Sequence, residues 1–302
     1  MENDFIKSGE LHECQRDTDE WRAAKGYISK SGLKKIKQSP AHFKYGEEFK
    51  ETPALVEGKL YHCFVLEPVK FESEYYVFDD SVVCGALMAK GSKSPRSTKD
   101  YKTWMEGEYN IAAGRTLVEK KDYDKMVAMK KRLFSHPYAK MLLSNGIGEH
   151  GLIGKIQTIA GEIGIKLIID YRKDNKRIVI ELKTAKDASL NGFTRDAANN
   201  DYHIDAAFYS DMAELYYGDG MKTIFIFIAQ EKVKPYDFNL FEASPQFIGQ
   251  GRYEYEMLLQ LYKYCLDNDK WPGYQCFCAN RFGLLDLELP KYAIKSLDYY
   301  TY

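Results

Sequence analysis

Residues 166–185 read KLIIDYRKDNKRIVIELKTA. The stretch holds two runs of residues that favour strands, Lys166–Tyr171 and Arg177–Thr184, on either side of a polar link. Two such runs separated by a short polar segment predict a hairpin of adjacent strands. Charged residues interrupt both runs, so this hairpin is where we expect a buried sheet to carry chemically active side chains.

Three charged side chains of this hairpin are predicted to meet at one end of the sheet. Glu181 and Lys183 share a face of the second strand, because side chains alternate along a strand. A register that pairs Asp170 with Val179 or with Glu181 adds Asp170 to them. Two carboxylates are costly to bury without a compensating cation, and hard oxygen ligands favour Mg²⁺ or Mn²⁺ over zinc.

Two interpretations of this D-x(10)-E-x-K spacing remain open from these residues alone. In the functional one, Asp170 and Glu181 hold a divalent metal, and Lys183 holds or deprotonates the water that the metal activates. In the structural one, Glu181 and Lys183 form an ion pair on an exposed face of the sheet, as charged pairs on sheets often do. The pattern itself is weak, and its context in the chain has to decide.

The composition of the 302 residues is that of a globular protein with a core, at 45% hydrophobic and 29% charged residues. The formal net charge of -1 excludes a basic field over the whole molecule. Two local runs are nevertheless basic: Lys25–Lys44 contains six lysines and no acid, and Lys90–Lys102 contains five basic residues against one acid. Each run fits either contact with a phosphate backbone or a solvated helix face.

The sequence predicts a cytoplasmic protein without membrane contact. Its N-terminal stretch does not resemble a signal peptide, and no apolar run approaches the ~20 residues that span a bilayer. Scattered cysteines predict free thiols. Cys265, Cys276 and Cys278 lie near one another in the chain, but their spacing matches no usual zinc or iron–sulfur ligand frame.

Hydrophobic periodicity predicts one α/β domain over residues 1–302, with a mixed central sheet flanked by helices. Outside the hairpin, we predict a helix that ends before Pro68, helices over Asp122–Leu143, Asn199–Tyr217 and Pro245–Asn268, and strands over Tyr75–Phe78, Ile153–Ile159, Thr223–Ala229 and Phe238–Phe241. The remaining predictions are a polar, peripheral extension over residues 1–20, a mobile basic loop over 85–102, a loop with a short helical turn over 187–194, and an irregular tail over 279–302.

Several segments, in their order along the chain, resemble the RecE-like exonucleases, the exonuclease VIII and phage-type branch of the PD-(D/E)xK nuclease superfamily. The segments are HCFVLEPVKF, IDYR, ELKTA and DYHIDAAFYSD, and the resemblance runs from about Ile28 to about Tyr274. It implies a restriction-endonuclease-like core and a Mg²⁺-dependent exonuclease, with Mn²⁺ as a substitute ion. Such an enzyme degrades linear duplex DNA from its 5′ ends and leaves 3′ single strands.

The resemblance also implies a metal site. The family's G-x-x-x-H element falls on Gly58 and His62, its central aspartate on Asp170, and its E-x-K pair on Glu181 and Lys183. Lys183 is then expected to orient the attacking water. The implied metal ligands, the last of them through its backbone carbonyl, are His62, Asp170, Glu181 and Leu182.

The family's Q-x-x-x-Y helix falls on Asp205 and Tyr209, so that aspartate replaces the expected glutamine. Glutamine both donates and accepts hydrogen bonds, whereas ionised aspartate only accepts. Tyr209 is therefore expected among the catalytic residues, and Asp205 either reaches the metal through water or leaves this role to Tyr209. Glu149 is expected beside the ligands, and the implied contacts to DNA and its 5′-phosphate are Lys25, Ser29 and Ser31.

The family implies partners as well. Its members form rings around DNA, so we expect a ring-shaped trimer or tetramer that acts on duplex ends and works with a single-strand annealing protein in phage-type recombination. Two alternatives remain. One is another PD-(D/E)xK nuclease, either an endonuclease or a CRISPR-adaptation nuclease, and the other is a protein that binds DNA on the same fold, or serves as an interaction module, without catalysis.

Overall fold

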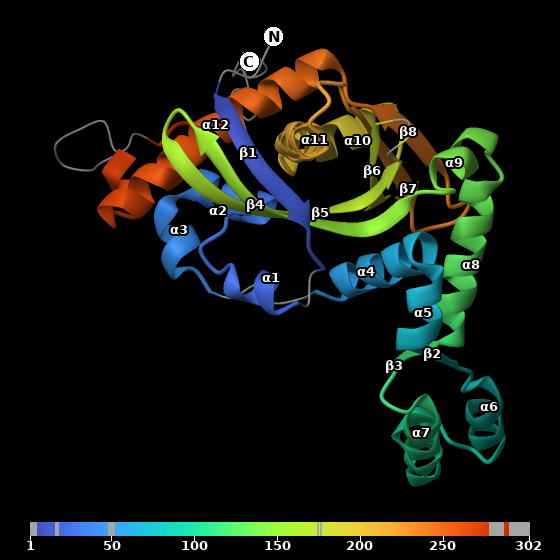
Figure 1. Cartoon of the computed structure of the whole chain (residues 1–302). Helices are drawn as coiled ribbons and strands as arrows, with labels where there is room; N and C mark the ends of the chain where they lie inside the picture. The colour runs from blue at the N-terminus through green and yellow to red at the C-terminus, as the bar shows by residue number, and fades with distance from the viewer. Residues whose placement is uncertain are drawn as a thin grey trace, which may run out of the picture.

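A mixed six-stranded sheet with helices on both faces forms the centre of the computed structural model (Figure 1). The structure describes residues 5–15, 18–47, 52–173, 175, 177–277 and 287–289. Neighbouring strands are antiparallel except β6 and β7, which are parallel. In their order across the sheet, the strands are β1 (Ile6–Glu13), β4 (Ile147–Thr158), β5 (Gly161–Lys173), β6 (Ile178–Ala185), β7 (Ile224–Glu231) and β8 (Phe238–Glu242). The predicted α/β class with a mixed sheet is confirmed.

Strands β5 and β6 form the predicted hairpin and fix its register. Tyr171 lies opposite Ile180, and continuing this antiparallel register by one residue places Asp170 opposite Glu181. This is the second of the two registers that we considered. The alternation along β6 is also as predicted, because Val179 belongs to the core on one face of the sheet and Ile180 to the core on the other.

Each face of the sheet is covered by its own set of helices, with a hydrophobic core beneath each set. The first face carries α2 (Lys30–Gln38), α10 (Leu190–Asn199), α11 (Tyr202–Tyr217) and α12 (Pro245–Asn268). The second face carries α4 (Pro53–Leu66), α5 (Pro68–Glu74), α8 (Lys120–Phe134) and α9 (Pro137–Leu142). Helices α10 and α11 form the crossover that parallel strands require between β6 and β7.

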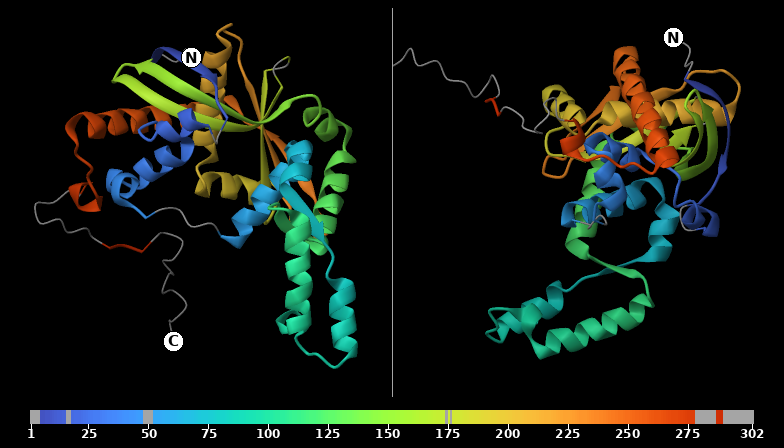
Figure 2. Two further views of the ribbon diagram at one scale, coloured as in Figure 1. Left: turned by 60° about the horizontal axis from the view of Figure 1, so that its bottom comes forward. Right: turned by 90° about the vertical axis from the view of Figure 1, so that its left-hand side faces the viewer.

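A smaller unit projects from the second face, as both views in Figure 2 show. It consists of the parallel strands β2 (Tyr75–Phe78) and β3 (Thr116–Glu119), with α6 (Ser81–Ala89), η1 (Pro95–Ser97) and α7 (Lys99–Ala112) between them. The remaining elements are α1 (Asp19–Ala23), α3 (Pro40–Tyr45) and η3 (Tyr274–Phe277). No helix in the described parts of the chain is both long and apolar enough to cross a membrane.

Three local predictions are wrong, each for a physical reason. Residues 6–13 form the edge strand β1, which needs few apolar side chains because its backbone pairs with β4. The helix predicted over Asp122–Leu143 is two helices, because Pro137 lacks an N–H and starts α9. The loop predicted over residues 85–102 is largely helical, since Thr98 caps α7 and only a short turn around Gly91, at φ 90°, separates α6 from η1.

A fourth prediction was too short rather than misplaced. The helical turn expected within residues 187–194 is the start of α10, which Ser189 caps and which continues to Asn199. The predicted strands over Tyr75–Phe78 and Thr223–Ala229 and the helix over Pro245–Asn268 are present as β2, β7 and α12. Most of the predicted tail, along with Cys278, lies outside the described residues.

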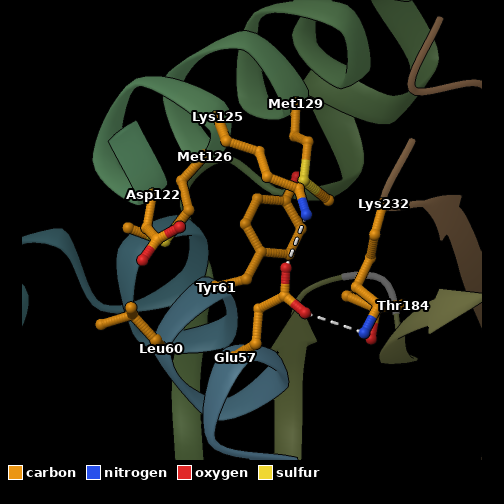
Figure 3. A pocket seen from close by; sticks show the side chains of 9 residues that line it. All are labelled: Glu57, Leu60, Tyr61, Asp122, Lys125, Met126, Met129, Thr184 and Lys232. Carbon is orange, nitrogen blue, oxygen red and sulfur yellow. Dashed lines mark hydrogen bonds and ion pairs between the residues drawn. The ribbon is translucent and has the colours of Figure 1, made fainter. Parts of the chain in front are cut away.

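Helix α4 is fastened to α8 and β7 by polar contacts at the end of the sheet (Figure 3). Glu57 accepts from Lys125 of α8 at 2.6 Å and from Lys232, just after β7, at 2.9 Å. The buried Tyr61 hydroxyl donates to Gln230 Oε1 at 2.5 Å, and Gln230 Nε2 donates to the Met129 carbonyl. These contacts fix the position of the residue after Tyr61, which is His62.

We expect Tyr61→Phe to lower the free energy of unfolding by about 1–3 kcal/mol, because Gln230 Oε1 would lose its donor in a dry environment. Urea denaturation followed by circular dichroism measures this change. Tyr109→Phe is the matched control, since the Tyr109 side chain is 62% exposed. An equal denaturation midpoint for the two variants would contradict this account of how α4 is held.

Candidate active site

The charged residues of the β5–β6 hairpin meet side chains from four other elements at one end of the sheet. Asp170 comes from β5, and Glu181 and Lys183 come from β6. Helix α4 contributes His62, β4 contributes Glu149, α2 contributes two lysines, and α11 contributes two residues that are described below. The sequence brought only the hairpin residues together by spacing, and the structure adds the rest.

His62, Glu149 and Asp170 form the first half of this site. Each offers one ligand atom, and these atoms all lie within 4.8 Å of one another. His62 Nδ1 lies 3.5 Å from Asp170 Oδ2, and the Leu182 N–H donates to the same oxygen at 3.1 Å. The side chain of Leu182 belongs to the core beneath α4 and α8. Its backbone reaches the site through the amide, which bonds Asp170, whereas the resemblance implied the carbonyl as a metal ligand, and that role stays a prediction.

Glu149 reaches this cluster through an unusual backbone. It adopts a left-handed conformation, with φ 45°, between Gly148 and His150, which pair with β5 on either side of Asp170. A Cβ atom at Gly148 would lie 2.7 Å from the Leu66 carbonyl oxygen at the end of α4. Glycine therefore permits the close approach of β4 and α4 that brings Glu149 and His62 together. We had expected Glu149 only beside the ligands, and the structure places it among the potential ligand atoms.

Glu181 and two lysines form the second half of the site. Glu181 is 1% exposed, and its Oε1 accepts from Lys183 Nζ at 2.5 Å and from Lys30 Nζ at 2.7 Å. An ion pair between Glu181 and Lys183 is thus present, as the structural interpretation required. It is buried, however, and not on an exposed face of the sheet. That burial favours the functional interpretation, because nothing in packing alone requires charges at this place.

The surroundings move the acidities of the two hairpin carboxylates in opposite directions. Burial alone would raise the pKa of Glu181, but Lys183 and Lys30 outweigh it and hold this pKa well below its usual range. Burial raises the pKa of Asp170, and the nearby Glu181 carboxylate raises it further. Two lysines thus neutralise Glu181 directly, whereas Asp170 has one backbone amide and the imidazole of His62.

Asp205 and Tyr209, both on α11, face the lysines of α2. Asp205 is fully buried and takes an ion pair from Lys34 Nζ at 2.7 Å, with Lys30 Nζ 4.0 Å away. Lys30 Nζ also lies 4.7 Å above the ring of Tyr209, which belongs to the core beneath α2. Burial raises the pKa of Tyr209 well above its usual range, so the hydroxyl keeps its proton. Asp205, which stands where the RecE-like pattern has glutamine, is therefore neutralised by an ion pair with Lys34.

The first half of the site fits a divalent metal ion. Its donors are carboxylate oxygens and one imidazole nitrogen. In the second half of the site, Glu181 Oε2 is buried without a hydrogen-bond partner among the described residues. Buried polar atoms are rarely left in this state, and a bound cation would satisfy it. His62 was implied as a ligand by its G-x-x-x-H element, but Gly58 is only in ordinary contact with β6, since an added Cβ would lie 3.7 Å from Thr184 Oγ1.

A second group of potential ligand atoms lies further along the same lysine-bearing face of α2. It consists of Asp201, His203 and Glu254. Lys37 already bonds both carboxylates of this group, Asp201 at 2.6 Å and Glu254 at 2.7 Å. Since an ammonium group occupies the place that an ion would take, we expect no metal there.

The residues predicted to hold the 5′-phosphate are only partly at the site. Ser29 caps α2, and its hydroxyl lies 3.0 Å from that of Ser31, in the turn that also carries Lys30. The start of α2 thus lies at the carboxylates, because Lys30 contacts Glu181. Lys25 is exposed in the turn between α1 and α2 and takes no part in the contacts described above.

Sequence reasoning missed the contribution of Lys30 and Lys34 to the carboxylate site. Both lie in the basic run Lys25–Lys44, for which the sequence leaves open contact with a phosphate backbone or a solvated helix face. Their spacing of four residues, with Lys37 three further on, places all three on one face of α2. A basic stripe on a helix that also has a buried apolar face could have suggested that its lysines point toward buried acids. Their partners, Glu181 and Asp205, lie more than 150 residues away in the chain.

We expect Lys34→Met to lower the free energy of unfolding by about 3 kcal/mol, because it leaves Asp205 buried without its main partner. The double variant Lys34→Met with Asp205→Leu is expected to recover most of this loss, since it removes both charges. Urea denaturation of the two single variants and the double variant measures the coupling. Strictly additive losses would show that the two side chains do not interact.

Comparisons with known proteins bear on the family and the fold. Residues 29–281 match the model of a family described as a PDDEXK-like domain of unknown function (DUF3799). No curated protein sequence matches the chain. Among solved structures, the crystal structure of a protein named "Putative exonuclease" from Eubacterium rectale is similar, with a TM-score of 0.56 at 15% identity over 92% of this chain and 95% of that chain.

A second solved structure, that of the protein SSO0001, covers 76% of this chain and 93% of its own at 16% identity. Its TM-score of 0.28 is too low to bear on the fold. The Eubacterium rectale structure supports the fold, and the match over residues 29–281 covers most of the chain, including every residue of the site. The chain therefore belongs to the family of PDDEXK-like domains of unknown function (DUF3799), in agreement with the PD-(D/E)xK core that the resemblance implied.

Proposed function

We propose that this protein is a metal-dependent exodeoxyribonuclease that degrades linear duplex DNA from its 5′ ends and leaves 3′ single strands. One observation carries the proposal. Four buried or half-buried acids, Glu149, Asp170, Glu181 and Asp205, converge with Lys183 and His62 at one end of a PDDEXK-like sheet. The name of the Eubacterium rectale protein agrees with an exonuclease.

His62, Glu149 and Asp170 would hold the metal ion, and Glu181 would contribute its unpartnered Oε2. We propose Mg²⁺, with Mn²⁺ as a substitute, because the donors are mostly hard carboxylate oxygens. The bound ion would supply Lewis-acid chemistry at the scissile phosphate. The backbones of α4 and β4 position the side chains of His62 and Glu149. These two elements are in close contact at Gly148.

Lys183 would orient the attacking water. Its ammonium group lies 2.5 Å from Glu181 Oε1 and 4.9 Å above the ring of Tyr202, so the carboxylate and the aromatic face restrict its position. An ammonium group has three donors, so Lys183 can bond Glu181 and a water or phosphate oxygen at the same time. Lys30, which shares Glu181 Oε1, is placed to contact a neighbouring phosphate together with Ser29 and Ser31.

Our proposal for assembly and partners follows the resemblance to RecE-like exonucleases. We propose a ring-shaped trimer or tetramer that encloses the duplex and hands the 3′ strand to a single-strand annealing protein. The net charge of -1 supports a closed ring for the following reason. The protein as a whole attracts DNA only weakly, so a ring that encloses the duplex would keep it bound through successive cleavages.

We expect isothermal titration with Mn²⁺, in the absence of DNA, to show binding that His62→Ala and Asp170→Asn each weaken by at least about tenfold. His203→Ala is the matched control, because Lys37 already compensates the second group of ligand atoms. Loss of binding in the control variant, with normal binding in His62→Ala, would move the metal to that second group.

We expect the protein to digest linear duplex DNA when Mg²⁺ is present and not when EDTA is present, while covalently closed circles survive. A label at the 5′ end should be released before a label at the 3′ end. Glu181→Gln and Lys183→Met should each lower the rate by at least about 10²-fold, since each removes a charge at the reacting phosphate.

Glu162→Gln is the matched control for this digestion, because Glu162 pairs with Lys155 on the exposed end of the β4–β5 hairpin, away from the site. It should keep full activity. Cut circles would show an endonuclease instead. Intact DNA that the protein nevertheless retains on a gel would show a binding protein without catalysis.

A further inference from the structure

The unit that projects from the second face of the sheet has no role in the site described above. We call residues 75–119, from β2 to β3, the arm. Figures 1 and 2 show it extending away from the sheet, with the connection between α6 and α7 at its outer end. That connection and the start of α7 carry the second basic run of the sequence, Lys90–Lys102.

The arm is a packed unit. The Trp104 ring contacts Phe78, with ring centres 6.2 Å apart, and also contacts Tyr101. Arg96 bonds Asp80 at 2.8 Å and Glu119 at 2.9 Å, and so fastens the α6–α7 connection to the ends of both strands. The tip of the arm therefore has a fixed shape.

Three acids of the arm, Asp80, Glu108 and Glu119, are occupied by its internal contacts, whereas Asp100 and Glu106 on α7 are exposed. Asp80 accepts from Arg96 and from the Tyr101 hydroxyl, and Glu119 accepts from Arg96 as well. Glu108 accepts from the Tyr76 hydroxyl at 3.0 Å. Arg96 is thus neutralised inside the arm, whereas the lysines around it are not.

Four lysines of this run remain available, and we call them the basic tip: Lys90, Lys93, Lys99 and Lys102. All four are exposed, and none forms an ion pair with any residue that the structure describes. Ser94 and Ser97 are exposed between them, and Gly91 adds no side chain, so a ligand can approach the backbone closely. Only Asp100 opposes them within the run.

The chemistry of this surface fits a phosphate backbone better than a protein partner. Interfaces between proteins are depleted in lysine and contain aromatic or apolar anchors. No large hydrophobic side chain is exposed between residues 89 and 103. Solvated ammonium groups on small, polar residues attract phosphates without reading bases.

We propose that the basic tip is a second binding site for the phosphate backbone of duplex nucleic acid, separate from the carboxylate site. This inference rests on the proposed function only in taking DNA as the substrate. The arm would hold duplex away from the end being digested. Lys30 and Lys34 at the start of α2 are already bonded to Glu181 and Asp205, so the tip adds unpaired positive charge at a distance from the carboxylate site.

The test is a variant with Lys90, Lys93, Lys99 and Lys102 all changed to Ala, compared by fluorescence anisotropy with the unchanged protein. The probe is a labelled duplex of about 40 base pairs, roughly 130 Å long at ~3.4 Å per pair, in EDTA so that nothing is cut. We expect at least about tenfold weaker binding and a plot of log affinity against log salt that is shallower by about 3–4.

The matched control changes Lys7, Lys131, Lys140 and Lys270 to Ala. These four are also exposed but are spread over the body, so the control removes the same total charge. It should keep the steep salt dependence. A further variant with Arg at all four tip positions should keep both the affinity and the slope, and equal denaturation midpoints establish that all variants are folded.

Each outcome bears on the inference separately from the proposed nuclease. Weaker, less salt-dependent binding of the tip variant alone supports the inference, even if the protein cuts no DNA. Equal binding by the tip variant and the unchanged protein overturns it, even if the protein is an active exonuclease. Equal losses in the tip variant and in the control also overturn it, since they would reflect total charge only.

Discussion

Burial of the Glu181 carboxylate is the constraint on which the rest of the site depends. A carboxylate that is 1% exposed costs several kcal/mol unless a positive group lies against it. Lys183 lies two residues further along the same strand, but Lys30 comes from α2, which precedes β6 by about half the chain. The position of α2 is therefore set by charge as well as by the packing of Leu33 and Ile36. The charge balance of the site and the arrangement of helices on the first face therefore depend on each other.

The positive groups of the site are unevenly distributed along its row of carboxylates. Glu149, Asp170 and Glu181 occupy three neighbouring strands, so three like charges lie in a row across the sheet. The lysines stand at the Glu181 end of this row. Towards the Glu149 end lies His62, whose Nδ1 is 3.5 Å from Asp170 Oδ2. A cation bound at this end would balance the row, and this is also where the ligand atoms are closest together. Charge compensation and ligand geometry thus point to the same place.

The sequence was informative where local rules act and silent where distant segments meet. The hairpin and the alternation of Val179 and Ile180 follow from a two-residue period and were predicted, whereas the register was one of two that this period allows. The left-handed Glu149 was not, because its conformation depends on the contact between Gly148 and the end of α4. The pairing of Lys30 with Glu181 was not, because it joins segments 151 residues apart. The edge strand β1 was missed because backbone pairing needs no apolar pattern. Roles for His62 and Asp205 came from the resemblance, and their neighbours came from the structure.

The two basic runs of the sequence look alike, and the structure separates them. Along α2, Lys30 bonds Glu181, Lys34 bonds Asp205, and Lys37 bonds Asp201 and Glu254, so this stripe balances the acids of the protein itself. On the arm, Arg96 takes the nearby acids, and the lysines around it stay exposed. A protein with a net charge of -1 has to attract a polyanion through local groups, and lysines that are not already paired with an acid contribute most to this attraction. What a run of lysines does is therefore decided by where the acids of the chain lie, which the run itself does not reveal.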